Sequence, residues 1–387
     1  MMATQRVFRM PVTIFGRSAS DNIGPELKAL GARKVFIVTD EVLWRLGVLK
    51  RIVSSLKAEK LEFQVYDRLP TEPTVDFVND GTKLFQESGA NVILAVGGGT
   101  PIDTAKAISI MATNGGSIAD YMGANKIPSP GVPLVAVPAT AGTGSEVTIF
   151  TIITNAKTNV KMLIASPHLM PRLAIVDPLL TLTMPKGLTA ATGLDALTHA
   201  IEAYVSRKAQ PMTDILALSA IKLLAENLPG AWANGNDLEA REKTMLGAYQ
   251  AGLAFGNASV ALVHGMSRPV GAHFHIAHGM SNATLLGQVM EFSLPGNPKR
   301  YAEIAAALGE NIAGLADMDA AKKGASAVKR IIRQLEIPRL RDLGIDREKF
   351  HEVIPQMIEA AIASGSPDNN PRIATKGEMA EIYRQAY

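Results

Sequence analysis

The chain has 387 residues, with 39 Lys and Arg against 36 Asp and Glu, which gives a net charge of +3. Hydrophobic residues make up 47% and charged residues 19%, a mixture that excludes a disordered protein and predicts two or three compact domains. No cysteine is present, so disulfides, thiolate nucleophiles, iron–sulfur clusters and cysteine-ligated zinc are excluded. Any metal must therefore bind His, Asp or Glu, and five of the seven histidines lie between positions 199 and 278.

The sequence shows no recognisable secretory signal or membrane-spanning segment. Arg6 and Arg9 are not followed by the apolar block of a secretory signal, and no apolar run approaches the roughly 20 residues of a membrane span. Lys and Arg are scattered rather than gathered in a basic run with aromatic residues. We therefore expect a soluble, cytoplasmic protein that acts on a small molecule, with neither nucleic acid nor membrane as a partner.

In the first half, short apolar runs alternate with stretches of helical periodicity. The runs lack polar–apolar alternation, as strands buried on both faces of a parallel sheet do; they are Val35–Val38, Val92–Val96, Leu134–Val137 and Leu173–Val176. Helical periodicity marks Gly24–Leu30 and Val75–Glu87. This alternation predicts an α/β, Rossmann-like dinucleotide-binding domain over residues 1–184.

The second half changes in style after Thr183. Ala, Leu, Met, Ile, Glu and Lys dominate, and we expect the long helical segments to break at Pro229 and Gly230, at Pro295 and at Pro338. Residues 214–228 show one apolar face at helical spacing. The sequence therefore predicts an all-helical second domain over residues 185–387.

A glycine-rich loop follows the predicted strand at 92–96. Gly97, Gly98 and Gly99 stand directly before a helix that carries Ile102, Ala105 and Ile108. Small residues let backbone amides approach an anion, and a helix N-terminus offers free N–H groups, so the loop suits a pyrophosphate. An ordinary glycine turn at a strand end is the alternative.

Two further strand ends are candidates for cofactor contacts. Asp40 ends the predicted strand at 35–38, where a carboxylate can accept hydrogen bonds from an adenosine ribose and repel a 2′-phosphate, which favours NAD over NADP. The alternative is a turn or cap residue. After the strand at 134–137, a loop contains the hydroxyls of Thr140, Thr143, Ser145 and Thr148. These hydroxyls either line a bound ligand or have a structural role within the loop.

The clustered histidines indicate a metal. Asp195 and His199 are four residues apart, so on a helix they lie on one face. His264 and His278 follow, separated by a segment that Pro269 and Gly271 are expected to break. One carboxylate with three imidazoles suits Fe(II) or Zn, whereas an isolated Asp/His pair is more often a surface contact.

Taken together, these motifs are similar to those of the iron-containing (group III) alcohol dehydrogenase family. The resemblance spans nearly the whole chain and rests on GGGTPIDTAKAI, PATAGTGSEVT, DALTHAIEAY, two HG elements and NNPRIATKGEMAEIY, in the family's order. It implies a dinucleotide-binding domain, a helical domain, a cleft that holds NAD(P) and a divalent metal, and a homodimer or a higher homo-oligomer.

The resemblance also assigns roles to residues. The four metal ligands of the family match Asp195, His199, His264 and His278. The family's contact to the adenosine ribose matches Asp40. The family's phosphate loop and the other residues that line its cofactor site match Gly97, Gly98, Gly99, Thr100, Asp103, Ala139, Thr140, Thr148 and Lys161. Phe150 and Phe255 match positions at the nicotinamide and substrate end, with ordinary core as the alternative. Glu72 stands where the family often has Asn.

The expected chemistry is hydride transfer between a small alcohol and NAD, assisted by a metal that lowers the pKa of the alcohol. One position departs from the family. Arg268 stands four residues after His264, where many relatives carry a His that relays the alcohol proton, and Arg is a poor base but a good anchor for an anion. We predict His273 as the proton carrier, with His275 as the other candidate in that segment.

Two other activities remain open at this stage. Arg268 would also suit a maleylacetate reductase-like enzyme that acts on an acidic substrate, although such reductases generally lack the metal. A dehydroquinate synthase-like lyase shares the architecture, but it needs several convergent Lys, Arg and Asn, and the region from 195 to 282 is mostly apolar around its histidines. The sequence leaves the physiological substrate, the direction of reaction and the metal in the cell undetermined.

Overall fold

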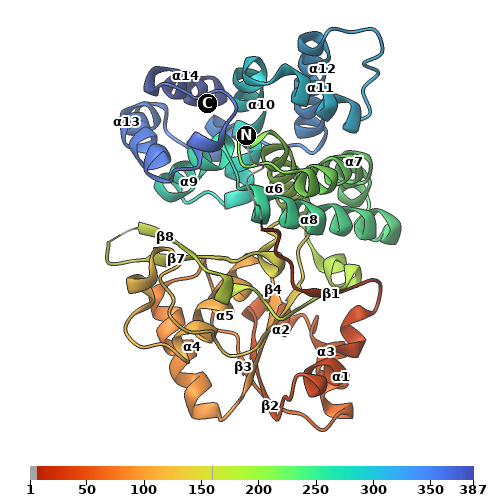
Figure 1. The fold of residues 1–387 in the computed structure, drawn as a ribbon, viewed down its shortest axis with the longest axis vertical. Coiled ribbons are helices and arrows are strands. Elements are labelled where there is room, and N and C mark those ends of the chain that lie inside the picture. Colours follow the sequence, from red (N-terminus) through yellow and green to blue (C-terminus); the bar gives the residue numbers. More distant parts are fainter. Residues whose placement is uncertain (1–6, 159) are drawn as a thin grey trace. The chain divides into compact units, whose positions relative to one another are not determined.

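The computed structural model describes residues 7–158 and 160–387. The chain forms two compact units, one of residues 10–183 and the other of residues 184–387 together with residues 7–9 (Figure 1). The N-terminal segment joins the second unit because Arg9 exchanges hydrogen bonds with Asn257: its N–H donates to Oδ1 at 2.7 Å and its carbonyl accepts from Nδ2 at 2.9 Å. Among the described residues, no helix is both long and apolar enough to cross a membrane.

The first unit contains a six-stranded, fully parallel sheet in the order β1-β9-β6-β4-β2-β3. The strands are β1 (Val12–Phe15), β2 (Lys34–Val38), β3 (Glu62–Tyr66), β4 (Val92–Gly97), β6 (Leu134–Pro138) and β9 (Leu173–Val176). The chain runs outward from β2 to β3 and then returns to β4 on the other side of β2. This reversal makes the carboxyl ends of β2 and β4 the switch point at which such sheets bind ligands.

Both faces of this sheet are buried, as the unbroken apolar runs predict. In β2, Val35 and Ile37 pack into a core with α1 (Ile23–Ala29) and α3 (Lys50–Ala58). Phe36 and Val38 face the opposite way, into a core with α4 (Val75–Ser88) and α5 (Gly99–Met111). Successive strand side chains point to opposite faces, so one apolar run serves two cores, and Figure 1 shows these helices around the sheet.

Some elements of the first unit are absent from the sequence-based prediction. The edge strands β1 and β3 are largely half-exposed and therefore lack a continuous apolar run. A second, three-stranded sheet joins β5 (Gly123–Ala124), β8 (Val160–Ala165) and β7 (Phe150–Asn155), with β7 and β8 antiparallel. The predicted α/β architecture of this unit is confirmed, with this addition.

Residues 184–387 fold entirely through helices, which confirms the predicted helical class. The long helices that build its centre are α6 (Lys186–Val205), α7 (Pro211–Ala233), α8 (Leu238–Ala258), α9 (Leu262–Phe274) and α10 (His278–Ser293). The remaining α-helices are α11 (Pro298–Ala307), α12 (Asp317–Gln334), α13 (Arg347–Ala363) and α14 (Lys376–Ala386). Sixteen of the twenty residues of α6 are buried, so this helix is the core of the unit.

Two expected helix breaks do not occur. Pro229 and Gly230 lie inside α7, and Pro269 and Gly271 lie inside α9. A proline in a helix removes one hydrogen bond and costs about 3 kcal/mol. Tertiary packing offsets this cost, because α7 packs against α6 and α8, and α9 against α10 and α13. Consequently Arg268 continues the helix that begins just before His264.

A buried lysine joins α5 to the loop that leads into β7. Lys106 is fully buried, and its Nζ donates to the carbonyls of Thr148 and Phe150 at 2.9 and 2.7 Å and to the Thr148 hydroxyl at 3.1 Å. Burial lowers the pKa of Lys106 to about 8, although Asp103 and Glu146 oppose the shift. The ammonium group therefore stays mostly protonated at neutral pH and satisfies three buried acceptors.

We expect Lys106→Met to lower the free energy of unfolding of the first unit by about 3 kcal/mol, because the two carbonyls would stay buried without a donor. Urea denaturation followed by circular dichroism at pH 7 measures this change. Lys57→Met, at an exposed position of α3, is the matched control and should lie within about 0.5 kcal/mol of wild type. Equal stability of the two variants would contradict the role given to Lys106.

Candidate functional site

The predicted cofactor loops meet at one edge of the parallel sheet. Gly97 ends β4 opposite Pro138, which ends β6, and the Ala139 N–H donates to the Gly97 carbonyl at 2.9 Å. Asp40 follows β2, the other neighbour of β4. Three segments predicted from separate parts of the sequence therefore lie at adjacent carboxyl ends of strands.

The glycine loop is shaped for close approach. Gly97 has a φ of +149°, which side-chain-bearing residues rarely adopt, and a Cβ there would lie 2.6 Å from Pro101. Gly98 caps α5, so the first N–H groups of this helix point out of its N-terminus. A Cβ on Gly98 would touch Thr140, whose buried hydroxyl has no hydrogen-bond partner among the described residues. Free amides beside this unpartnered hydroxyl fit the phosphates of a dinucleotide.

The other predicted cofactor residues have contacts within the first unit. The Asp40 carboxylate caps α2 (Glu41–Arg45) by accepting from the Leu43 N–H at 2.9 Å, and burial raises its pKa. Asp103 accepts from the Ser145 hydroxyl and from the Ile152 N–H. The Thr148 hydroxyl accepts from Lys106. These contacts give each of the three a structural task, so their roles in cofactor binding remain predictions.

Lys161 and Glu72 form a pair that the sequence alone does not suggest. Lys161 lies on β8, and its Nζ is 2.5 Å from Glu72 Oε2. The negative charge of Glu72 therefore offsets the positive charge of Lys161, a residue predicted to contact the cofactor. Thr100 lies in the first turn of α5, and Phe150 begins β7.

The predicted metal ligands converge around one oxygen atom in the helical unit. Asp195 Oδ1 lies 3.9 Å from His199 Nε2, 3.6 Å from His264 Nε2 and 3.8 Å from His278 Nε2. Asp195 and His199 come from α6, His264 from α9, and His278 is the first residue of α10. The first three are buried and can offer one ligand atom each within 4.8 Å of one another.

These distances fit a metal ion. Ligands placed about 2.1 Å from a tetrahedral ion are about 3.4 Å apart, so a small contraction of this cluster would complete such a shell. A buried carboxylate with three imidazoles is also a donor set for Fe(II) or Zn. The chemistry of the residues present therefore agrees with the metal that the sequence predicts.

Glu202, which the sequence reading missed, orients one of the histidines. Its Oε2 lies 2.6 Å from His264 Nδ1, and its Oε1 accepts from the Val263 N–H at 2.5 Å. A carboxylate on Nδ1 fixes the proton there and leaves the Nε2 lone pair for a metal. Its spacing in the sequence could have identified it, because Glu202 is seven residues after Asp195 and three after His199 and therefore lies on the same helix face.

Asn282, the second missed residue, lies inside the ligand cluster. Its Nδ2 donates to Asp195 Oδ1 at 2.6 Å and lies 3.0 and 3.2 Å from the Nε2 atoms of His264 and His278. Because Nδ2 carries two hydrogens, it can also donate to one of these two Nε2 atoms, which then presents its lone pair to the cluster. Its Oδ1 is buried without a hydrogen-bond partner in the described part of the chain, so a polar acceptor remains beside the donor set.

The protonation states of Asp195 and His278 suit metal binding. Burial alone would raise the pKa of Asp195, but His199, His278 and His264 hold it well below its usual range. Burial lowers the pKa of His278, and the positive charge of Arg268 contributes to this shift. At neutral pH, Asp195 is therefore ionised and His278 is a neutral imidazole, which are the forms that bind a metal.

The remaining predicted residues lie around the cluster or beyond it. Phe255 stacks on His199, with ring centres 4.0 Å apart, and forms an apolar wall. His273 is nine residues after His264 on α9, about 13.5 Å along the axis. His275 is exposed and ends α9 with a φ of +54°. A proton relay from His273 or His275 would need intervening groups or water.

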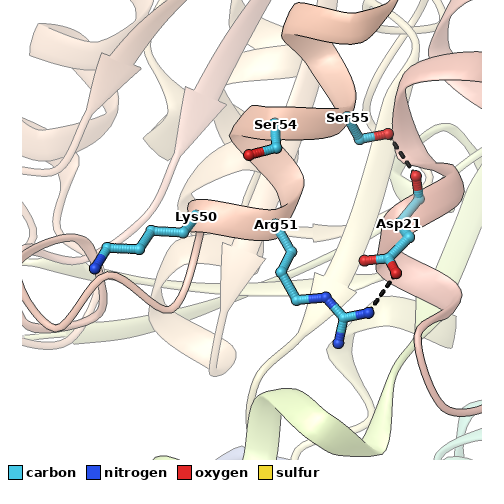
Figure 2. Close-up of a pocket in the computed structure, with 5 residues that line it drawn as sticks. All are labelled: Asp21, Lys50, Arg51, Ser54 and Ser55. Carbon is cyan, nitrogen blue, oxygen red and sulfur yellow. Dashed lines mark hydrogen bonds and ion pairs between the residues drawn. The ribbon is translucent and has the colours of Figure 1, made fainter.

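A surface hollow of about 300 Å³ lies beside α3 in the first unit (Figure 2). It is lined by Asp21, Lys50, Arg51, Ser54 and Ser55. Arg51 pairs with the Asp21 carboxylate, and the Ser55 hydroxyl donates to the Asp21 carbonyl. The lining groups largely satisfy one another, and we assign this hollow no part in the candidate site.

A parallel sheet with a glycine-rich strand exit, combined with a buried carboxylate and histidine cluster, is typical of a metal-dependent oxidoreductase. Residues 11–178 match the family model described as iron-containing alcohol dehydrogenase, and residues 189–387 match that of the Fe-containing alcohol dehydrogenase family, C-terminal. The chain belongs to the iron-containing alcohol dehydrogenase family, as the sequence motifs predict.

Whole-chain relatives support this placement. The chain is 41% identical to 1,3-propanediol dehydrogenase of Citrobacter freundii, over 97% of each chain. It is 39% identical to NAD-dependent methanol dehydrogenase of Bacillus methanolicus, over 98% of this chain and 99% of the relative. The crystal structure of a 1,3-propanediol oxidoreductase matches with a TM-score of 0.96 and 40% identity, over 99% of this chain and 100% of that one.

We expect Glu202→Gln to weaken metal binding by about 10- to 100-fold, because a glutamine amide cannot hold the His264 proton as a carboxylate does. Competition with a chromophoric chelator, with Fe(II) or Zn, measures the dissociation constant. Glu226→Gln, at an exposed position of α7, is the matched control. Wild-type affinity in Glu202→Gln would exclude Glu202 from metal binding.

Proposed function

We propose that this protein is a metal-dependent dehydrogenase that transfers hydride reversibly between a small alcohol or its aldehyde and NAD. The observation that carries the proposal is the convergence of three imidazole nitrogens on Asp195 Oδ1. The proposed metal is Fe(II), with Zn as the alternative. A bound divalent ion lowers the pKa of an alcohol and polarises a carbonyl, and NAD accepts the hydride.

The residues of this chain would prepare the reactants. Asp195, ionised at neutral pH, and the lone pairs of His199, His264 and His278 would hold the metal. Glu202 would keep the His264 ring oriented, and Phe255 would limit the access of water. The alcohol would then lose its hydroxyl proton, through water, to the predicted carrier His273, and its carbinol hydrogen, as hydride, to the nicotinamide.

The cofactor assignment rests on the first unit. The N-terminus of α5, with Gly97 to Thr100, would bind the pyrophosphate, Thr140 would donate its hydroxyl, and Asp40 would accept from the adenosine ribose. A carboxylate at Asp40 would repel the 2′-phosphate of NADP, which supports NAD. Methanol dehydrogenase of Bacillus methanolicus, described as NAD-dependent, is a relative.

We further propose a cytoplasmic protein that forms a homodimer or a higher homo-oligomer. The support is the family resemblance. Light scattering coupled to gel filtration measures the mass in solution, and a mass of 41.1 kDa, that of one chain, would contradict the proposal.

His264→Ala should lose bound metal and turnover together, because it removes the imidazole that lies deepest in the cluster. Metal content is measured by mass spectrometry, and NADH formation by absorbance with a panel of alcohols, diols and hydroxy acids after separate loading with Fe(II) and Zn. His351→Ala, on α13, is the control. Full activity in metal-free His264→Ala would exclude the metal-dependent mechanism.

The role of His273 as proton carrier is a separate prediction. It requires His273→Ala to lose one limb of the pH profile of kcat, because the proton-accepting group would be missing. His275→Ala, assayed beside it, tests the other candidate. A profile of wild-type shape would remove the mutated histidine from the mechanism. Because His273 lies about 13.5 Å from His264 along the axis of α9, its role would require water or other groups to carry the proton.

A further inference from the structure

Arg268 is placed one helical turn from a predicted metal ligand. It follows His264 by four residues on α9, so the two side chains leave the same face, about 6 Å apart along the helix axis. Its charge acts on His278, a second predicted ligand, and the charge of Glu202 acts on it. The guanidinium therefore lies in the electrostatic field of the ligand cluster.

The hydrogen-bonding capacity of Arg268 is mostly unused. Its Nη1 donates to the Ser366 hydroxyl at 3.3 Å, whereas its Nε is buried with no hydrogen-bond partner among the described residues. A guanidinium has five N–H donors in a rigid fork. Since one weak contact occupies one donor, the fork retains the geometry that accepts a planar anion through two parallel hydrogen bonds.

Glu202, the carboxylate whose charge acts on Arg268, is not the hydrogen-bond acceptor that the Arg268 Nε lacks. Both oxygens of Glu202 are committed, one to the Val263 N–H and the other to His264 Nδ1. Asp195 Oδ1 is surrounded by imidazole nitrogens. Arg268 forms no ion pair with a carboxylate in the described ranges, and a buried cation without a partner is costly unless a ligand provides one.

We propose that Arg268 is a specificity-determining residue that holds an anionic group of the substrate, a carboxylate or a similar planar oxyanion, while the hydroxyl end lies at the ligand cluster. The preferred substrates would then be short ω-hydroxy acids and their semialdehydes rather than neutral alcohols. This inference rests on the proposed dehydrogenase function and names its substrate class.

The experiment compares two substrates of equal length, 4-hydroxybutanoate and 1,4-butanediol, with the Fe(II)-loaded enzyme and NAD. The measured quantity is the ratio of their kcat/KM values. We expect wild type to favour 4-hydroxybutanoate and Arg268→Gln to lower the ratio by about 100-fold, because a site built for a polar group discriminates strongly when the partner is lost. Arg268→Lys should give an intermediate ratio, since it keeps the charge without the fork. Arg207→Gln, at an exposed arginine of the same unit, should keep the wild-type ratio.

A binding measurement without turnover separates this inference from the proposed function. Succinate should raise the melting temperature of metal-free wild type and fail to do so in Arg268→Gln. If wild type oxidises neither substrate with Fe(II) or Zn, the proposed function fails, and succinate binding still decides the inference. If 1,4-butanediol is oxidised and Arg268→Gln lowers both substrates equally or leaves the ratio unchanged, the inference is overturned while the dehydrogenase function stands.

Discussion

The helical unit is organised around a single carboxylate oxygen, Asp195 Oδ1, on which nitrogens from three imidazoles converge. This convergence requires α10 to start very close to α6. Gly279 makes the approach feasible, because a Cβ at this position would lie 2.6 Å from the carbonyl oxygen of Ala191. The absence of one methyl group thus allows His278, the preceding residue, to reach Asp195. The long buried helix α6 supplies the fixed side of the cluster, and α9 and α10 supply the rest.

The cluster combines buried charges whose costs are only partly offset by hydrogen bonds. Asp195 and Glu202 are each about 2% exposed and carry two negative charges against the single positive charge of Arg268. Burial lowers the pKa of His264, but Glu202 and Asp195 outweigh burial and raise it overall. With all three histidines neutral, as metal binding requires, the cluster has one surplus negative charge, which a divalent cation would reverse to one surplus positive charge. Burial of uncompensated charge is unfavourable. The arrangement is therefore better explained by the ions it binds than by its contribution to stability.

The sequence predicted those parts of the molecule in which one local pattern determines the outcome. The strands β2, β4, β6 and β9 are buried on both faces and appear as apolar runs, whereas β1 and β3 at the sheet edges are largely half-exposed and were missed. The predicted ligands converge, but Glu202 and Asn282 were not foreseen, although they share helix faces with His199 and His278. Pro269 was expected to break a helix that tertiary packing preserves. Contacts between distant helices account for each of these differences.

Two cations among the described residues, Lys106 and Arg268, show how a structural charge differs from a functional one. Lys106 is surrounded by three oxygen acceptors from the chain itself, and its ammonium group needs nothing further. Arg268, also largely buried, has one distant hydroxyl and an Nε with no acceptor in the described residues. A buried N–H donor without an acceptor is unfavourable, so the Nε of Arg268 requires an acceptor that the described residues do not provide. The position of Arg268 beside the ligand cluster makes a substrate oxyanion the acceptor that best completes it.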